Sequence, residues 1–172
     1  ETKKLRSLFI KVIKTRVRSD FSLACLLSGG VDSTAIVSTA NKKLKKKIDC
    51  FSLLPKEDNY DESYFIDKTV NKEKLKHEYV ATFKDNKEKF NFLKKLITST
   101  SSLVPTTTWF AFSKLCKRIK KKGYKVILSG TGGDEMFAGY YIHHLHYLFS
   151  IRNSKNFDKK YNDWEKKLVP LL

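Results

Sequence analysis

The residues with the clearest chemistry are Ser28-Gly29-Gly30-Val31-Asp32-Ser33, which follow the apolar run 23–27 and precede a run of helix-forming residues. This order predicts a buried strand, a tight loop and the N-terminus of a helix. Such a loop presents several backbone N–H groups and the positive end of a helix dipole to one point in space. Because Gly29 and Gly30 lack a Cβ, an anion can approach the backbone closely. The segment therefore predicts a phosphate-binding loop, although a glycine-rich turn without a ligand would have the same outline.

Asp32 adds a requirement, because a carboxylate in an anion-binding loop repels phosphate unless a cation lies between them. The simplest arrangement is a Mg²⁺ ion held by Asp32 and by phosphate oxygens. The loop has neither the Gly-x-x-x-x-Gly-Lys-Ser/Thr pattern of a Walker A loop nor the glycine fingerprint of a dinucleotide-binding turn. We therefore expect a different kind of nucleotide-binding loop.

A second glycine-rich segment, 129–135, follows a predicted strand over residues 125–128. Six of the seven glycines lie in or beside these two segments: Gly29, Gly30, Gly130, Gly132, Gly133 and Gly139. Both segments follow the carboxyl ends of predicted strands, where ligands bind in open parallel sheets. If the first and fourth strands are neighbours, the two loops face one another, and Asp32 and Asp134 can share one Mg²⁺ ion.

Predicted strands and helices alternate along the chain. Strands are expected over residues 22–27, 48–54, 77–82 and 125–128, and helices over 3–18, 33–44, 60–75, 86–98 and 109–122. A helix rich in aromatic residues and histidines should follow residue 135, and residues 156–172 could form one more. Strands separated by helices require right-handed crossovers, so the expected fold class is α/β, with a parallel sheet flanked by helices.

The chain of 172 residues carries a formal net charge of +17, which at first suggests a nucleic-acid-binding protein. Its lysines, however, fall in runs such as 42–47 and 120–122 with few aromatic residues between them, which favours exposed helix faces. Cys25, Cys50 and Cys116 form no Cys-x-x-Cys pair, so neither a disulfide framework nor a zinc site is expected. No run approaches the ~20 apolar residues of a membrane span, and we expect a cytoplasmic protein.

The segment 28–33 matches the Ser-Gly-Gly-x-Asp-Ser signature and resembles the loop of the PP-loop ATP pyrophosphatases. Two further segments extend the likeness: Tyr60-Asp61-Glu62-Ser63, after the second predicted strand, and the Ser-Gly-x-Gly-x-Asp-Glu-x-Phe-x-Gly-Tyr pattern over 129–140. In this order and spacing, the three segments resemble the synthetase domain of the asparagine synthetase family over roughly residues 3–148. PP-loop enzymes that modify tRNA share only the first segment.

The resemblance implies a three-layer fold like that of the adenine-nucleotide α-hydrolases, with residues 1–150 as a PP-loop synthetase domain. It implies an ATP-dependent ligase that adenylates a carboxylate, releases pyrophosphate and forms an amide with ammonia derived from glutamine. Residues 151–172 would begin a C-terminal helical part, and the N-terminal glutaminase domain and catalytic lysine of such enzymes would lie outside this segment. Because the chain starts at Glu1 and Met136 is its only methionine, we expect it to be part of a longer protein.

The resemblance also implies a role for individual residues. Pyrophosphate and Mg²⁺ would be held by Ser28, Gly29, Gly30, Asp32 and Ser33, with Asp134 as the second metal ligand. The adenosine would be bordered by Leu27, Leu53, Ser129 and Gly130. The residues nearest the reaction would be Asp32, Asp134 and Thr131. ATP and Mg²⁺ are thus the expected cofactors, and a small carboxylate is the expected substrate.

Thr131 departs from the Ser-Gly-Glu-Gly sequence of asparagine synthetases proper, in which the Glu acts near the reacting carboxylate and amine. A hydroxyl cannot act as a carboxylate base at neutral pH, so a sugar carboxylate is an alternative acceptor to aspartate. Family members associated with surface polysaccharide synthesis look similar, including a Gly-Tyr-Tyr sequence followed by histidines. Two other function classes stay open: a PP-loop enzyme acting on tRNA, and a non-catalytic module that binds ATP and Mg²⁺.

Three histidines, His143, His144 and His146, follow the second glycine-rich segment. Their helical offsets do not converge on one metal ion, so we expect a structural or solvated role for them. Tyr140 and Tyr141 either close the pocket or pack in a core.

Overall fold

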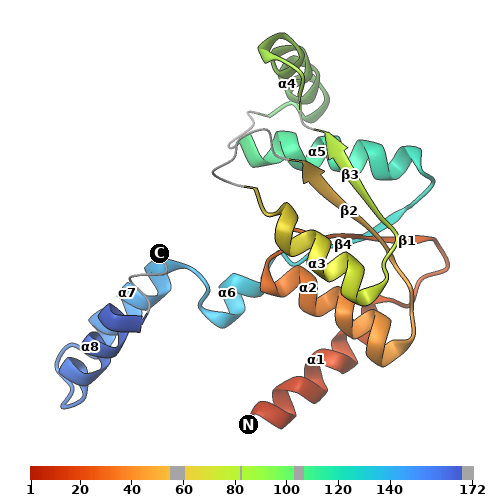
Figure 1. The fold of residues 1–172 in the computed structure, drawn as a ribbon. Coiled ribbons are helices and arrows are strands. Elements are labelled where there is room, and N and C mark those ends of the chain that lie inside the picture. The colour runs from red at the N-terminus through yellow and green to blue at the C-terminus, as the bar shows by residue number, and fades with distance from the viewer. Residues whose placement is uncertain (55–60, 82, 103–106, 168–172) are drawn as a thin grey trace. The chain divides into compact units, whose positions relative to one another are not determined.

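A computed structural model of the chain describes residues 1–54, 61–81, 83–102 and 107–167 (Figure 1). The chain divides into two compact units, Glu1–Gly130 and Thr131–Leu172. The first unit contains the sheet and the loop around Ser28, and the second is helical.

The first unit is built on a parallel sheet with the strand order β3-β2-β1-β4. Its strands are β1 (Leu23–Leu26), β2 (Asp49–Leu54), β3 (His77–Ala81) and β4 (Val126–Leu128). In β1, Cys25 lies opposite Cys50 of β2 on one side and opposite Leu128 of β4 on the other. The predicted parallel sheet is confirmed. The first and fourth strands are neighbours, which is the condition under which the two glycine-rich segments can face one another. Thr82, expected to end the third strand, lies outside the described residues.

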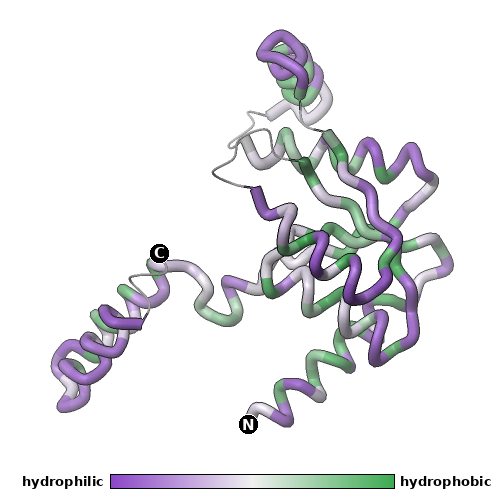
Figure 2. Tube along the Cα trace, in the orientation of Figure 1, coloured by the Kyte–Doolittle hydropathy of each residue, from purple (hydrophilic) through white to green (hydrophobic). Residues whose placement is uncertain are grey.

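Helices cover both faces of this sheet. They are α1 (Thr2–Arg16), α2 (Val31–Ser38), the π-helical η1 (Thr39–Lys43), α3 (Ser63–Glu73) and α5 (Thr107–Lys121). A further helix, α4 (Asn86–Thr100), contacts α5. The odd-numbered residues of β1 share a core with α1, α2 and α3, whereas Ala24 and Leu26 share a second core with Leu115 and Ile119 of α5. Because β1 is buried on both faces, the sheet is the middle of three layers, as predicted. Figure 2 shows the hydrophobic colouring along the central strands.

The helix expected over residues 33–44 differs from the prediction in both position and type. α2 begins at Val31, directly after the loop, and the π-helix η1 replaces the expected α-helix from Thr39. Lys45 then adopts a left-handed backbone with φ of 53°, and the Lys46 N–H donates to the Ala40 carbonyl at 2.9 Å. The prediction of one continuous α-helix is therefore wrong in its second half, where the backbone is held by a different hydrogen-bonding pattern.

The helix expected from residue 60 begins at Ser63. The Asp61 carboxylate accepts a hydrogen bond from the Ser63 N–H at 2.8 Å, which holds residues 61–63 in a turn ahead of α3. Tyr60 lies outside the described residues. The helix expected over 109–122 is α5, and Gly123, with φ of 91°, ends it as predicted.

The second unit contains α6 (Gly133–Phe137), α7 (Tyr141–Ser150) and α8 (Phe157–Lys167). The single helix expected after residue 135 is divided in two, because Ala138 adopts a left-handed backbone with φ of 57° and ends α6. The tail helix is confirmed as α8, although residues 168–172 lie outside the described part. α7 and α8 are in contact through the rings of Tyr141 and Trp164, whose centroids are 5.8 Å apart.

Within the described residues, we looked for a membrane-spanning helix, a metal-binding cluster and paired cysteines. No helix there is long and apolar enough to span a membrane. No group of three or more His, Cys, Asp or Glu side chains is arranged to hold a metal ion. The three cysteines are free thiols, and burial raises the pKa of Cys50 to about 12.

Glu73 joins two of the helices that cover one face of the sheet. Its side chain is only 3% exposed, and it pairs with Lys42 of η1 at 2.8 Å. The Ser38 hydroxyl donates to the same carboxylate at 3.1 Å, and the Asn41 amide donates to the Glu73 backbone carbonyl at 2.7 Å. Burial acts to raise the pKa of Glu73, but the hydrogen bonds from Lys42, Ser38 and Asn41 outweigh it and lower the pKa below its ordinary value of 4.5.

We predict that Glu73→Gln lowers the free energy of unfolding at pH 7 by about 1–2 kcal/mol, because it removes charge-assisted hydrogen bonds. Since the folded-state pKa is lowered, the contribution of Glu73 is fully present above its unfolded pKa and is lost as the pH falls through the folded value. Urea unfolding at several pH values should show the variant and the wild type converging well below pH 4.5. Glu165→Gln on exposed α8 is the control and should change little; a constant gap at all pH values would contradict the prediction.

Candidate nucleotide-binding site

The loop 28–33 lies at the carboxyl end of β1 and leads directly into α2. Gly30 is the residue at the N-cap of α2, and it has no side chain to satisfy the N–H groups of the first helical turn. The Thr34 N–H donates to the Gly30 carbonyl at 3.2 Å, so the helical hydrogen bonds begin there. The N–H groups of residues 31–33 therefore point beyond the helix end, where an anion can accept from them.

Ser28 and Ser33 brace the loop from inside. The Ser28 N–H donates to Ser33 Oγ at 3.2 Å, and the two hydroxyl oxygens are 3.1 Å apart. Ser33 Oγ also donates to the Gly30 carbonyl at 3.3 Å. Since Ser33 is buried and Ser28 is exposed, Ser33 holds the shape of the loop, whereas Ser28 lies where a ligand can reach it.

Gly29 meets two separate requirements. Its φ of 76° lies in the left-handed region, and a Cβ on it would come within 3.2 Å of the Glu62 carbonyl and the Phe65 Cβ at the start of α3. The loop therefore packs tightly against α3 at this point. Gly30 is different, because a Cβ on it would approach only Ser28 Oγ, at an ordinary distance of 3.4 Å. The sequence predicted that an anion can approach the backbone at both glycines. The structure adds that Gly29 also has to pack against α3.

Residues Ser129 and Gly130 lie beside the first turn of α2. A Cβ on Gly130 would come within 3.0 Å of the Ser33 backbone nitrogen and 3.1 Å of the Asp32 Cβ. The pairing of β1 with β4 thus brings the beginning of the second glycine-rich segment against the first loop. Within the first unit, the predicted residues 28–33 and 129–130 form one cluster.

Two polar side chains in this cluster fit an anion and a cation. Asp32 is half-buried, and its carboxylate makes no hydrogen bond or ion pair with any residue that the structure describes. The Thr34 hydroxyl is buried without a hydrogen-bond partner among the same residues. Together with the N–H groups of residues 31–33, these donors suit phosphate oxygens, and the carboxylate suits Mg²⁺.

The two leucines predicted to border adenosine lie on opposite faces of the sheet. Leu27 is 1% exposed and belongs to the core beneath α2 and α3, so its main chain is the part that a ligand could contact. Leu53 is half-buried and packs against the core on the α5 side.

Thr131 and Asp134 belong to the second unit, and Thr131 is exposed. Asp134 lies in the first turn of α6, where its backbone carbonyl accepts from the Gly139 N–H at 2.9 Å. A Cβ on Gly139 would lie 1.9 Å from Asp134 Oδ1, so only glycine leaves this carboxylate in its place. Whether Asp134 shares a metal ion with Asp32 stays a prediction.

Sequence reasoning missed Ser52 and His77. The Ser52 hydroxyl is buried in β2 and donates to the Leu27 carbonyl, the last one before the loop. Because Ser52 has only one proton, its oxygen accepts from His77 Nε2–H, at 2.8 Å. Burial lowers the pKa of His77, although the nearby Asp67 and Glu78 carboxylates act to raise it. A serine inside an apolar strand was the only available signal.

These two residues anchor the start of the loop to β2. The Leu27 N–H donates to the Phe51 carbonyl at 3.0 Å, and the Leu27 carbonyl accepts from Ser52. Both peptide groups of Leu27 are therefore fixed before the chain turns into Ser28.

The fold and this loop define an α/β protein of the PP-loop class. A solved structure with the same arrangement is the NH3-dependent NAD synthetase from Campylobacter jejuni, in complex with the nitrate ion. It aligns with a TM-score of 0.53 and 16% identity, covering 81% of this chain and 61% of that chain. At this identity the likeness shows the fold alone.

The asparagine synthase family model matches residues 4–169, and the chain belongs to that family. It is 29% identical over 143 residues to a putative glutamine-hydrolyzing asparagine synthetase of Methanocaldococcus jannaschii, covering 80% of this chain and 26% of the relative. It is 31% identical over 147 residues to the glutamine-hydrolyzing asparagine synthetase of Bos taurus, and this match covers 81% of this chain and 26% of that relative. The chain thus spans about a quarter of the length of these relatives.

We predict that Ser52→Ala lowers the free energy of unfolding by about 1–3 kcal/mol, because it leaves the Leu27 carbonyl and His77 Nε2 without their shared partner. Urea unfolding of Ser52→Ala, His77→Ala and the double variant forms a mutant cycle. We expect the His77 substitution to cost clearly less once Ser52 is absent. Ser22→Ala, an exposed serine beside β1, is the matched control. Fully additive effects would show that the two side chains are not coupled.

Proposed function

We propose that the chain is the ATP-binding core of a ligase that adenylates a carboxylate, releases pyrophosphate and forms an amide with ammonia derived from glutamine. One observation carries the proposal: at the carboxyl end of β1, the first turn of α2 combines Asp32 with N–H groups that have no side-chain cap among the described residues. Membership of the asparagine synthase family supports it, since the match includes both glycine-rich segments. The second segment also favours this function over that of a PP-loop enzyme acting on tRNA.

In this proposal the residues of the first unit bind the nucleotide. The N–H groups of residues 31–33 and the Ser28 hydroxyl donate to the oxygens of the pyrophosphate portion. Ser33 keeps the loop in shape, and Gly29 and Gly30 allow the phosphate to approach the backbone. The main chain of Leu27, together with Leu53, Ser129 and Gly130, borders the adenosine. Asp32 and Asp134 hold Mg²⁺, which when bound neutralises charge that develops on the leaving pyrophosphate.

Thr131 bears on which acid is activated. It follows Gly130 directly and is exposed, but its hydroxyl cannot act as a carboxylate base at neutral pH. We therefore propose a small carboxylate as the acceptor, either aspartate or, as the alternative that Thr131 raises, a sugar carboxylate. The same residue is the reason to keep a non-catalytic ATP-binding module as the competing function.

We propose that residues 1–150 are the synthetase domain and that 151–172 begin a further helical part. The names of the relatives include glutamine hydrolysis, so we propose that a glutaminase domain outside residues 1–172 supplies ammonia. The buried free thiols Cys25 and Cys50 are consistent with a reducing cytoplasm.

The test is pyrophosphate release from ATP and Mg²⁺ by the full-length protein, with a panel of uronic acids and amino acids that includes aspartate. We expect release that depends on one acid and falls about a hundredfold in Asp32→Ala. Asp20→Ala, which removes an exposed carboxylate ahead of β1, is the matched control and should keep wild-type activity. ATP binding without release, whichever acid is present, would instead support the non-catalytic module. Sequence-specific tRNA binding that weakens steeply with salt would favour the tRNA enzyme.

A second prediction tests Asp134 through its neighbour. Gly139→Ala places a methyl group on the Asp134 carboxylate, so the carboxylate must move. We expect the Mg²⁺ concentration for half-maximal pyrophosphate release to rise at least about tenfold, as in Asp134→Ala. Met136→Ala, at an 80% exposed residue of α6, is the control. An unchanged Mg²⁺ dependence would remove Asp134 from the metal site.

A further inference from the structure

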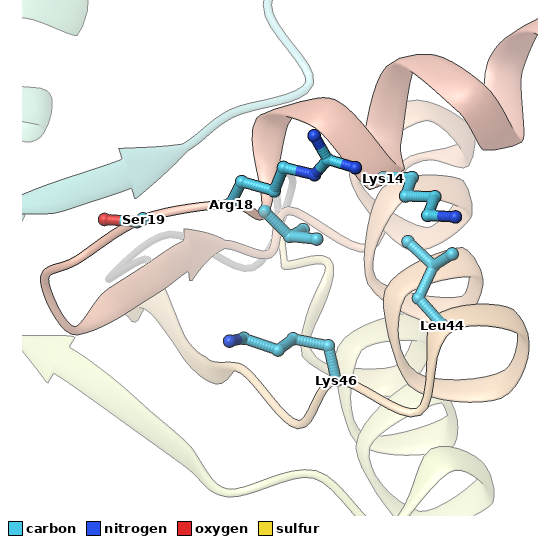
Figure 3. A pocket seen from close by; sticks show the side chains of 6 residues that line it. Lys14, Arg18, Ser19, Leu44 and Lys46 are labelled. Carbon is cyan, nitrogen blue, oxygen red and sulfur yellow. The ribbon is translucent and has the colours of Figure 1, made fainter.

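A cavity open to solvent lies at the opposite end of β1 from the loop 28–33. Its volume is about 440 Å³, and it is lined by Lys14, Val17, Arg18, Ser19, Leu44 and Lys46 (Figure 3). These residues come from the end of α1, the connection to β1 and the segment after η1. The four residues of β1 separate this cavity from the loop by about 13 Å, so the two sites are distinct.

Ordered backbone presents the cationic side chains to this cavity. At the end of α1, the Val17 N–H donates to the Ile13 carbonyl at 2.9 Å and the Arg18 N–H donates to the Thr15 carbonyl at 3.3 Å. On the other side, the left-handed turn at Lys45 and the hydrogen bond from the Lys46 N–H to the Ala40 carbonyl hold the backbone of Lys46. Figure 3 shows Lys14 and Arg18 along one side and Lys46 across from them.

The three cations have no acidic partner among the described residues. Some other basic residues of the first unit do have one: Lys42 pairs with Glu73, Lys76 with Asp49, and both Arg118 and Lys122 with Glu78. Lys14, Arg18 and Lys46 form no such ion pair. The negative end of the α1 dipole stabilises the positive charge of Lys14, which lies in the last turn of that helix. It does not stabilise the charge of Lys46, which comes from another element.

The walls of the cavity indicate what kind of anion it suits. Three positive charges match the charge of two linked phosphoryl groups, and repulsion between the cations is relieved when such an anion binds. Val17 and Leu44 add an apolar surface beside the charges, which a bare inorganic ion would leave unused. The Ser19 oxygen accepts from the Phe21 N–H at 3.0 Å, so its own proton can be donated to a ligand.

We propose that this cavity binds a diphosphate group, preferably that of a nucleoside diphosphate, at a site separate from the loop 28–33. The proposal does not depend on the reaction proposed above. It requires only that Lys14, Arg18 and Lys46 act together on one anion.

Isothermal titration of the full-length protein with ADP tests it, with the number of bound anions per chain as the readout. The triple variant Lys14→Gln, Arg18→Gln, Lys46→Gln should bind one ADP fewer per chain. Each single substitution should weaken the affinity of that binding event about tenfold. The control triple variant Lys11→Gln, Arg16→Gln, Lys47→Gln removes equal charge from nearby residues that do not line the cavity, and it should keep that event. Ser33→Ala, which disturbs the loop, should also keep it.

Two results would overturn the proposal: an isotherm that the cavity variants leave unchanged, or an equal loss in the control triple, which would mean general attraction to a basic surface. Pyrophosphate in place of ADP distinguishes the source of the diphosphate. If pyrophosphate binds more weakly than ADP, the ligand is a nucleotide and Val17 and Leu44 contribute to its binding. If the two bind equally tightly, the cavity is assigned to inorganic diphosphate. Succinate that binds as tightly as either would contradict recognition of phosphate. Thermal unfolding checks that every variant is folded. We expect little change in the two triple variants, whose side chains are exposed.

Discussion

The parallel pairing of β1 with both β2 and β4 is the constraint on which the candidate site depends. β1 is buried on both faces, so its position between two helical layers is set by the packing of alternate side chains. The chain adds β2 and β3 on one side of β1 and then returns to add β4 on the other. Strand order therefore reverses at β1, and the crevice that such a reversal opens at the carboxyl ends receives both the loop 28–33 and residues 129–130.

The loop holds its shape through contacts within the protein. Ser33 forms hydrogen bonds with Ser28 and Gly30, Gly29 packs on α3, and Leu27 is tied to β2 by its N–H and its carbonyl. A loop arranged in advance loses little conformational entropy when a ligand binds, so its N–H groups can act on an anion without first being ordered. Unlike these groups, the Asp32 carboxylate has no partner within the described residues that neutralises its charge. This is the chemical reason to expect a cation beside it.

Local patterns predicted the elements well wherever one interaction dominated. The strands were placed within one residue at each end. The signal was strongest in β1, because burial on both faces leaves little freedom in composition. Gly123 correctly marked the end of α5. The errors fell where the backbone departs from a regular helix: the π-helix after Ser38 and the break at Ala138. Neither Thr39 nor Ala138 is a residue type that signals such a change.

The sequence by itself determined the fold class and the loop, since glycines, a carboxylate and an apolar strand at fixed spacing carry their chemistry locally. Only the tertiary structure decided which distant residues support that loop. Ser52 and His77 lie 25 residues apart and meet because β2 and β3 pair in one register. Gly139 matters because the chain folds back on Asp134, and Lys46 joins Lys14 and Arg18 because a left-handed turn follows η1. Such contacts depend on register and turn geometry, which no short sequence pattern contains.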